Sequence, residues 1–373
     1  MVYLRRNLGK TLPLVGVIIL AVMLIAGIVA IMNSIPLSIR TIYGYSSKFL
    51  GVTTRGDATQ TAAIKAEIED NCPVPIDRVV VLRGSDVQVR SIVGKWPFVV
   101  LGLSQADIPY YIERQGGGKL VGRLPNPGAA EILLSEPIAR NLNKKIGDQV
   151  MGPEDADAFS PQVVRLVGIL ESPVWVAIGS LEYYQANHFP PIDVLLVFAK
   201  PVDRQAELDR WANDRFLGRN VRLLSYDQVE EDTDTMFDIL YKILNVVIGT
   251  LVIVITLMMG MLINIFLSQR IQEFGLLQAL GYTRSKIVGR VVAETLIVVF
   301  GGWVLGVIAA FGLLSAVRKV LMEPNAFALN AFDPQAYIYT IPVPCAILLV
   351  AVVTVQRRFR TFDPIGVVER RVV

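Results

Sequence analysis

The stretch Ser268–Arg290, SQRIQEFGLLQALGYTRSKIVGR, decides how the chain is organised. It lies between two long apolar runs and contains a short amphipathic segment that ends in Ala279-Leu280-Gly281. Gly281 is placed to end a helix, and Thr283 to begin the next one. We therefore expect a short basic helix on a membrane surface, joining two membrane-spanning helices. Its predicted apolar stripe recurs at every third position, at Ile271, Phe274, Leu277 and Leu280.

The composition favours a membrane protein. Of the 373 residues, 53% are hydrophobic and only 18% are charged, which is too apolar for a wholly soluble chain of this length. The formal net charge of +3 is modest and the basic residues gather beside apolar runs, so we expect the lipid bilayer and no nucleic acid as a partner. One histidine and two cysteines, Cys72 and Cys345, leave little for a metal site, and we expect no disulfide between them.

Four uncharged segments are long enough to cross a bilayer. Each offers about 20 residues, and at a rise of ~1.5 Å per residue this spans a ~30 Å hydrocarbon core. The first segment is longer than the apolar run of an ordinary signal peptide and lacks a clear cleavage site, so we interpret it as an uncleaved anchor. The segments are Leu14–Met32 and the runs between Lys242 and Arg270, Glu294 and Arg318, and Asp333 and Arg357.

Basic residues predict the orientation of these spans. Lys and Arg are enriched in cytoplasmic segments, and three basic clusters agree in placing both termini and residues 268–290 in the cytoplasm of a bacterial inner or plasma membrane. The region between the first two spans then lies outside, as a periplasmic or extracellular domain. The clusters are Arg5, Arg6 and Lys10; Arg270, Arg284, Lys286 and Arg290; and Arg357, Arg358, Arg360, Arg370 and Arg371.

The predicted fold class is an integral membrane α-helical protein with four transmembrane helices and a large extracytoplasmic α/β domain of two lobes. One lobe has a helix followed by strands near its start and a strand–helix–strand, βαβ pattern near its end, and the other is a β-rich insert at about residues 104–190, opened by three glycines. The expected elements are a helix at Thr61–Asp70, strands at Arg78–Leu82, Val87–Val93 and Phe98–Leu103, a strand at Ile192–Ala199, a helix at Asp203–Leu217 and a strand at Asn220–Ser225.

The predicted domains follow the spans. The second span is expected to continue outward as a stalk, because Thr235–Val247 carries apolar residues on one face. The predicted divisions are 1–35, a cytoplasmic segment and first span; 36–235, the extracytoplasmic domain; 236–267, the stalk and second span; 268–290, the cytoplasmic loop; 291–317, the third span; 318–335, a short external loop; 336–356, the fourth span; and 357–373, the cytoplasmic tail.

Two motifs resemble those of the MacB/FtsX-like family of type VII ABC transporter permeases. Members share an R-x-x-E-[FIL]-G-[LI]-x-x-A-[LIV]-G loop and a DP-[IVL] tail. The tail motif here is Asp363, Pro364 and Ile365. The matching loop residues are Arg270, Glu273, Phe274, Gly275, Leu276, Ala279, Leu280 and Gly281.

The external region adds to this resemblance, because four segments follow the order seen in the MacB-like periplasmic core domain. The two lobes then correspond to the porter and sabre subdomains of that family. The segments are Gly118–Arg123, Glu131–Ser135, Lys145–Asp148 and Val163–Leu170.

The resemblance implies a permease subunit, active as a homodimer, that works with a separate ABC ATPase. The chain has no G-x-x-x-x-G-K-[ST] phosphate loop, so ATP and Mg are expected in the partner and no cofactor in this chain. In the family the loop helix sits in a cleft of the ATPase, which makes Glu273, Phe274, Leu276 and Leu277 the expected contacts. ATP-driven motion would reach the external domain by mechanotransmission, for export or extraction of a drug, peptide, lipid or lipoprotein. A periplasmic adaptor and an outer-membrane component stay open as further partners.

Two other functions stay open. The chain could be a membrane-anchored receptor or regulator, for example of a cell-wall hydrolase, without transport. A membrane-tethered enzyme is disfavoured, because there is one histidine and no G-x-S-x-G elbow, and no catalytic residue is predicted. Within the spans, Gly302 and Gly306 form a G-x-x-x-G that favours close helix packing, within the chain or in a dimer. Glu294 is expected to pair with Arg290, one turn earlier.

Overall fold

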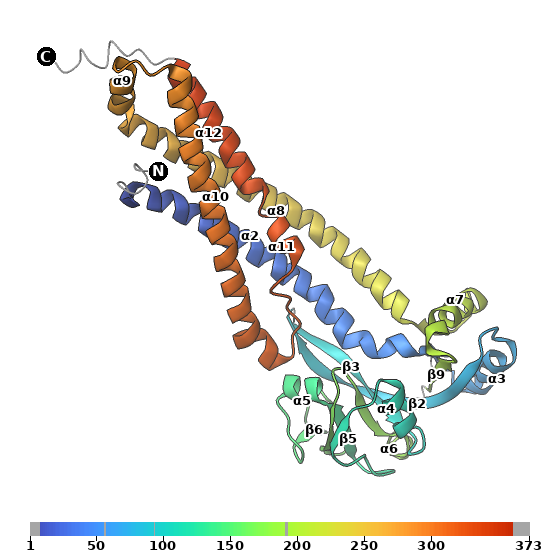
Figure 1. Ribbon diagram of the computed structural model, residues 1–373. Helices are drawn as coiled ribbons and strands as arrows, with labels where there is room; N and C mark the ends of the chain where they lie inside the picture. The colour runs from blue at the N-terminus through green and yellow to red at the C-terminus, as the bar shows by residue number, and fades with distance from the viewer. Residues whose placement is uncertain (1–7, 56, 93, 191–192, 361–373) are drawn as a thin grey trace. The chain divides into compact units, whose positions relative to one another are not determined.

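The computed structural model describes residues 8–55, 57–92, 94–190 and 193–360. The chain forms two compact units (Figure 1). The helical unit comprises the chain up to Asn33, Asp238–Arg318 and the chain from Asn330 onward. The α/β unit comprises Ser34–Phe237 and Lys319–Leu329.

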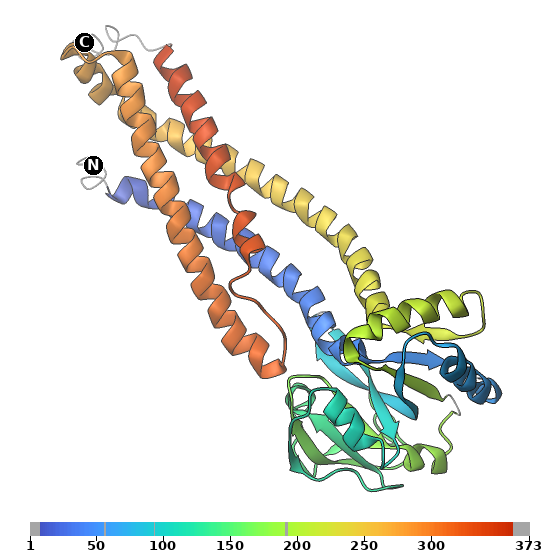
Figure 2. The ribbon, with the colours of Figure 1, turned by 45° about the vertical axis from the view of Figure 1, so that its right-hand side comes forward.

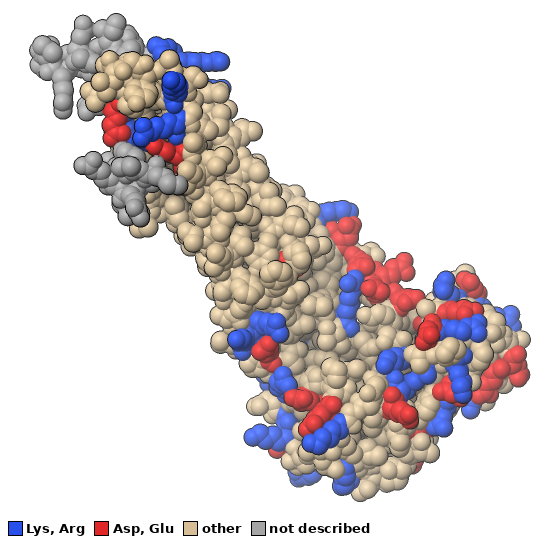
Figure 3. Space-filling model, viewed as in Figure 1, with Lys and Arg blue, Asp and Glu red and all other residues tan. Residues whose placement is uncertain are grey.

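Four long helices dominate the helical unit, and each is long and apolar enough to cross a membrane. Figures 1 and 2 both show α10 running beside α12. In Figure 3 the visible surface of these helices carries few charged atoms along its middle. These features confirm the predicted four membrane-spanning helices. The helices of this part of the chain are α2 (Leu8–Tyr43), α8 (Tyr226–Gln269), α9 (Ile271–Ala279), α10 (Arg284–Val317), α11 (Pro334–Ile338) and α12 (Pro342–Arg360).

Two glycines allow α10 to pack closely against α2. A Cβ atom added to Gly302 would lie 3.3 Å from Ile18 Cβ, and one added to Gly306 would lie 2.8 Å from Val22 Cβ. Both Ile18 and Val22 are fully buried. The G-x-x-x-G of the third span therefore faces another helix of the same chain.

The first lobe of the α/β unit is a four-stranded antiparallel sheet in the order β10-β1-β9-β2. Its strands are joined as β1-α3-β2 and β9-α7-β10, which is the split βαβ, ferredoxin-like connectivity. Both helices bury apolar side chains in one core with β1 and β9. The βαβ pattern predicted near the end of this lobe is confirmed, whereas β1 was not predicted. The elements are β1 (Leu50–Thr53), α3 (Thr61–Asn71), β2 (Ile76–Ser91), β9 (Val194–Ala199), α7 (Gln205–Phe216) and β10 (Arg222–Leu224).

The second lobe is inserted between β2 and β9. Its strands follow the order β2-β3-β8-β5-β7-β4, with β6 paired to β7, around a core that contains the fully buried Trp175, Phe98 and Tyr111. The predicted insert at about 104–190 lies within this lobe. Its elements are β3 (Gly94–Leu103), α4 (Ile108–Arg114), β4 (Lys119–Gly122), β5 (Glu131–Ser135), α5 (Glu136–Leu142), β6 (Gln149–Met151), β7 (Val164–Glu171), β8 (Ala177–Ser180) and α6 (Leu181–Ala186).

Strand β2 belongs to both lobes, which corrects the sequence prediction of two strands, Arg78–Leu82 and Val87–Val93. Its first part pairs with β9 and its second part, Arg83–Ser91, pairs with β3. Gly84 lies inside the strand without interrupting it. A Cβ at this position would lie 2.2 Å from the carbonyl oxygen of Val100, so only glycine lets β3 approach here. The glycine permits a close approach of two strands rather than a turn.

The segment after the third span is helical rather than a simple loop, and it belongs to the α/β unit. It continues as a π turn, Arg318–Met322, and the 3₁₀ turn η5, Glu323–Asn325. The side-chain amide of Asn141 on α5 donates to the carbonyl of Asn325 at 2.8 Å, and Ser38 donates to Ala328 O at 3.4 Å. The other 3₁₀ turns are η1 (Gly44–Lys48), η2 (Ala58–Gln60) and η3 (Val202–Arg204).

Candidate functional site: the α9 helix and its anchor

Helix α9 is bounded as the sequence predicts. It begins after Arg270 and ends with a Schellman motif, in which the amide of Gly281 donates to Gln278 O at 3.0 Å and that of Tyr282 donates to Leu277 O at 3.1 Å. Gly281 has φ +90°, a conformation that glycine adopts without strain. Thr283 then precedes α10 in an extended conformation.

A nearly buried arginine anchors α9 to the third span. The side chain of Arg270 is 6% exposed, and its Nη1 lies 2.8 Å from Glu294 Oε2 on α10. Its Nε also lies 3.1 Å from Glu273 Oε2, and its guanidinium is 5.3 Å from the ring of Phe266. The predicted pair of Glu294 with Arg290 is present at 3.4 Å. The shorter contact with Arg270 was not predicted.

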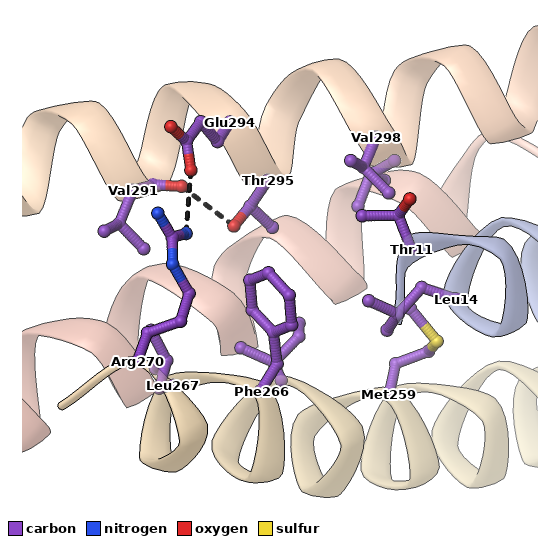
Figure 4. A pocket seen from close by; sticks show the side chains of 12 residues that line it. Thr11, Leu14, Met259, Phe266, Leu267, Arg270, Val291, Glu294, Thr295 and Val298 are labelled. Carbon is purple, nitrogen blue, oxygen red and sulfur yellow. Dashed lines mark hydrogen bonds and ion pairs between the residues drawn. The ribbon is translucent and has the colours of Figure 1, made fainter. Parts of the chain in front are cut away.

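Figure 4 shows Arg270 reaching from the end of α8 toward Glu294, with Phe266 beside it. A cavity of about 30 Å³ adjoins this ion pair, with a mostly apolar lining that includes Leu14, Met259 and Val298. A volume of this size can hold one or two water molecules. The ion pair therefore joins the end of α8 to α10 beside a small, mostly apolar cavity.

The residues of the predicted coupling motif point in two directions. Phe274 is 4% exposed and packs on Phe359 of α12, with ring centroids 5.2 Å apart, and Gly275 is also buried. Leu276 and Leu280 are 67% and 70% exposed. Glu273 and Ala279 are exposed, and Leu277 is half-buried.

This division corrects the single apolar stripe expected along the helix. A step of three residues falls short of a full turn by about 60° in a helix of 3.6 residues per turn. Over the three steps from Ile271 to Leu280 this amounts to about half a turn, so the ends of the expected stripe lie on opposite faces. In the structure Phe274 points toward α12. The outward apolar surface consists instead of Leu276, Leu280 and Tyr282.

The remaining predicted site residues lie elsewhere. Gly302 and Gly306 face α2, as described above. The tail motif Asp363, Pro364 and Ile365 lies outside the described residues. Among the residues that the structure describes, no group of three or more His, Cys, Asp or Glu side chains could hold a metal ion.

Four membrane-length helices, a two-lobed α/β unit and an amphipathic helix between the second and third spans define an integral membrane protein. Residues 245–356 match the family model described as FtsX-like permease C-terminal. The chain is also 33% identical over 93 residues to the bacitracin export permease protein BceB of Bacillus subtilis (strain 168). The predicted resemblance to MacB/FtsX-like ABC transporter permeases is thereby confirmed. The match to BceB covers 24% of this chain and 14% of that protein.

Solved structures of extracytoplasmic domains also match. The periplasmic region of MacB from Actinobacillus actinomycetemcomitans is 11% identical, with a TM-score of 0.29, over 52% of this chain and 95% of that chain. The extracellular domain of the noncanonic ABC-type transporter YknZ from Gram-positive bacteria is 13% identical, with a TM-score of 0.27, over 44% of this chain and 88% of that chain.

Proposed function

We propose that this chain is the membrane permease subunit of an ABC transporter, and that α9 is the surface to which a separate ATPase subunit binds. The observation that carries the proposal is the division of α9 into two faces. One face is fixed to the spans through Arg270 and Phe274, and the other exposes Leu276 and Leu280. An exposed pair of leucines on an anchored helix suits insertion into an apolar groove of a partner. ATP and Mg bind to that partner.

The anchor explains how a push on α9 would reach the spans. Arg270 connects α9 to α10, and Phe274 connects it to α12, so α9 moves with two spans rather than alone. Helix α8 is continuous over 44 residues, from Tyr226 in the α/β unit to Gln269 in the helical unit. This supports mechanotransmission, in which movement of the ATPase drives the extracytoplasmic domain to export or extract a drug, peptide, lipid or lipoprotein.

Within this proposal the termini and α9 are cytoplasmic, and the α/β unit is periplasmic or extracellular. The complex contains two copies of this chain and two ATPase subunits, with a periplasmic adaptor and an outer-membrane component as further partners. In a variant whose Cys72 and Cys345 are replaced by serine, an impermeant maleimide added outside should label Gly117→Cys and not Thr283→Cys. External labelling at position 283 would exclude this orientation.

The decisive experiment changes Leu276 and Leu280 together to Asp. Placing two charges in an apolar contact costs several kcal/mol, so ATPase recruitment should fall by at least about a hundredfold. The measurement is co-purification of an ABC ATPase subunit from native membranes, with membrane level and protease resistance as folding checks. Leu217→Asp is the matched control, because Leu217 is 84% exposed in the α/β unit. Undiminished co-purification from the double-Asp variant would leave a membrane-anchored receptor or regulator as the better description.

A further inference from the structure

An open groove runs between α8 and α12, within the helical unit. It has a volume of about 520 Å³, and its lining changes in character along its length. Leu257, Met261 and Val350 make one end apolar, and Asn264, Arg357 and Arg358 make the other end polar.

Contacts between the two helices show that the apolar part of α8 lies beside the apolar part of α12, and the polar part beside the polar part. At the apolar end, α8 and α12 approach so closely that a Cβ on Gly260 would lie 2.9 Å from Val350 Cγ1. At the polar end, Nη2 of Arg358 donates to Ser268 Oγ at 3.1 Å, so this arginine reaches across to α8. Asn264 follows Leu257 by seven residues, about 10 Å along a helix, and Arg357 follows Val350 by the same number. The groove is therefore amphipathic along its own axis.

The positions of the charges place the groove at the edge of the hydrocarbon layer. Helix α12 has no charged residue before Arg357, and α8 has none between Lys242 and Arg270. Arg357 and Arg358 therefore lie where the apolar run gives way to the headgroup region. Leu257 and Met261 are exposed, so the apolar end of the groove is open to surrounding acyl chains.

We propose that this groove binds one anionic phospholipid, with its phosphate at Arg357 and Arg358 and an acyl chain along Leu257, Met261 and Val350. Arginine binds phosphate with paired N–H donors, and two arginines at one site favour a lipid with net negative charge over a zwitterionic one. An apolar helix of a second copy is the poorer occupant, because the polar end of the groove, with Asn264, Arg357 and Arg358, offers it no apolar surface. Lipid binding at this site is separate from recruitment of an ATPase to α9.

The test uses the full-length chain in nanodiscs of equal parts phosphatidylglycerol and phosphatidylcholine, with retained lipids counted by native mass spectrometry. The wild-type chain should retain phosphatidylglycerol, and Arg357→Gln with Arg358→Gln should lower this preference by about 10- to 30-fold. Arg284→Gln with Lys286→Gln is the matched control, because it removes the same charge from the start of α10, outside the groove lining. An equal loss of preference in the control variant would show that the preference arises from the general surface charge of the protein, and would overturn the proposal.

A second variant tests the groove itself without changing charge. Thr354→Phe places a ring in the middle of the groove and should reduce retained phosphatidylglycerol at least fivefold. The unfolding temperature in lipid-free detergent should equal that of the wild type. Undiminished retention in both the Arg and the Phe variants would overturn the proposal. Displacement of the lipid by free glycerol phosphate would also overturn it, since the site would then bind phosphate and not lipid. A change of oligomeric state in the Phe variant would assign the groove to a second copy instead.

Discussion

The two connections that follow α8 and α10 are anchored by different chemistry. The first, residues 270–283, is held by charge, because Arg270 is nearly buried against Glu294. The second, residues 318–333, has an uncharged anchor at Asn325, where the fully buried side-chain amide of Asn141 donates to the backbone carbonyl. The first anchor lies within the helical unit and the second within the α/β unit.

This difference predicts how far each connection can shift relative to its anchor. An ion pair near a membrane surface tolerates small shifts, because the Coulomb attraction falls slowly with distance. The hydrogen bonds of an amide require short distances and good angles, so the second connection should move as one body with α5. Since the two anchors lie in different units, changes at one should add to changes at the other.

The largest expected effect comes from breaking the charged anchor. Glu294 is only 12% exposed, and in Arg270→Met it keeps Arg290, which is exposed, as its one partner among those described above. The change should therefore destabilise the helical unit by about 3–5 kcal/mol. Unfolding of the purified chain in mixed detergent micelles measures this. Adding Glu294→Gln should restore part of the loss, because the largely buried position 294 then carries no charge. Arg290→Met is the control and should cost less than about 1 kcal/mol.

The packing of α10 between the two connections gives the next largest effect. Gly306→Ile would force α2 and α10 apart, since even a Cβ meets Val22 at 2.8 Å, and should cost about 1–3 kcal/mol or more. Gly301→Ile is a matched control on the same helix, because no atom lies within 4 Å of its added Cβ. Thermal unfolding of both variants in the same detergent checks the difference, and an equal loss would show that the packing of α10 on α2 does not limit stability.

The uncharged anchor should give a smaller loss. Asn141→Ala removes the two hydrogen bonds with Arg90 and the one to Asn325, and should destabilise the α/β unit by about 1–3 kcal/mol because these backbone groups stay buried and unpaired. Cleavage by a protease within residues 318–333 should rise with it. Asn213→Ala, an exposed change on α7, should leave both measurements unaltered. A similar response of the two variants would mean that Asn141 is not an anchor.

Features set by neighbouring residues in the sequence could be predicted. The four spans follow from uninterrupted apolar runs, the end of α9 from Gly281, and the pair of Arg290 with Glu294 from a spacing of one helical turn. Features set by distant residues could not. Arg270 and Glu294 are 24 positions apart and meet only because α8 and α10 pack together. Phe274 turns inward because Phe359 receives it, and β2 stays unbroken because β3 and β9 pair with its two parts.

The smallest effect compares one left-handed residue in each connection. Gly281 has φ +90° and Ala326 has φ +57°, so the same exchange of glycine and alanine should have opposite signs at the two sites. Gly281→Ala adds a Cβ that meets no atom within 4 Å, and the backbone strain alone should cost about 1 kcal/mol. Ala326→Gly should relieve such strain, with a gain of less than about 1 kcal/mol because glycine also loosens the unfolded chain. Unfolding temperatures that fell equally in both variants would show that Ala326 is held by its neighbours rather than strained by its backbone.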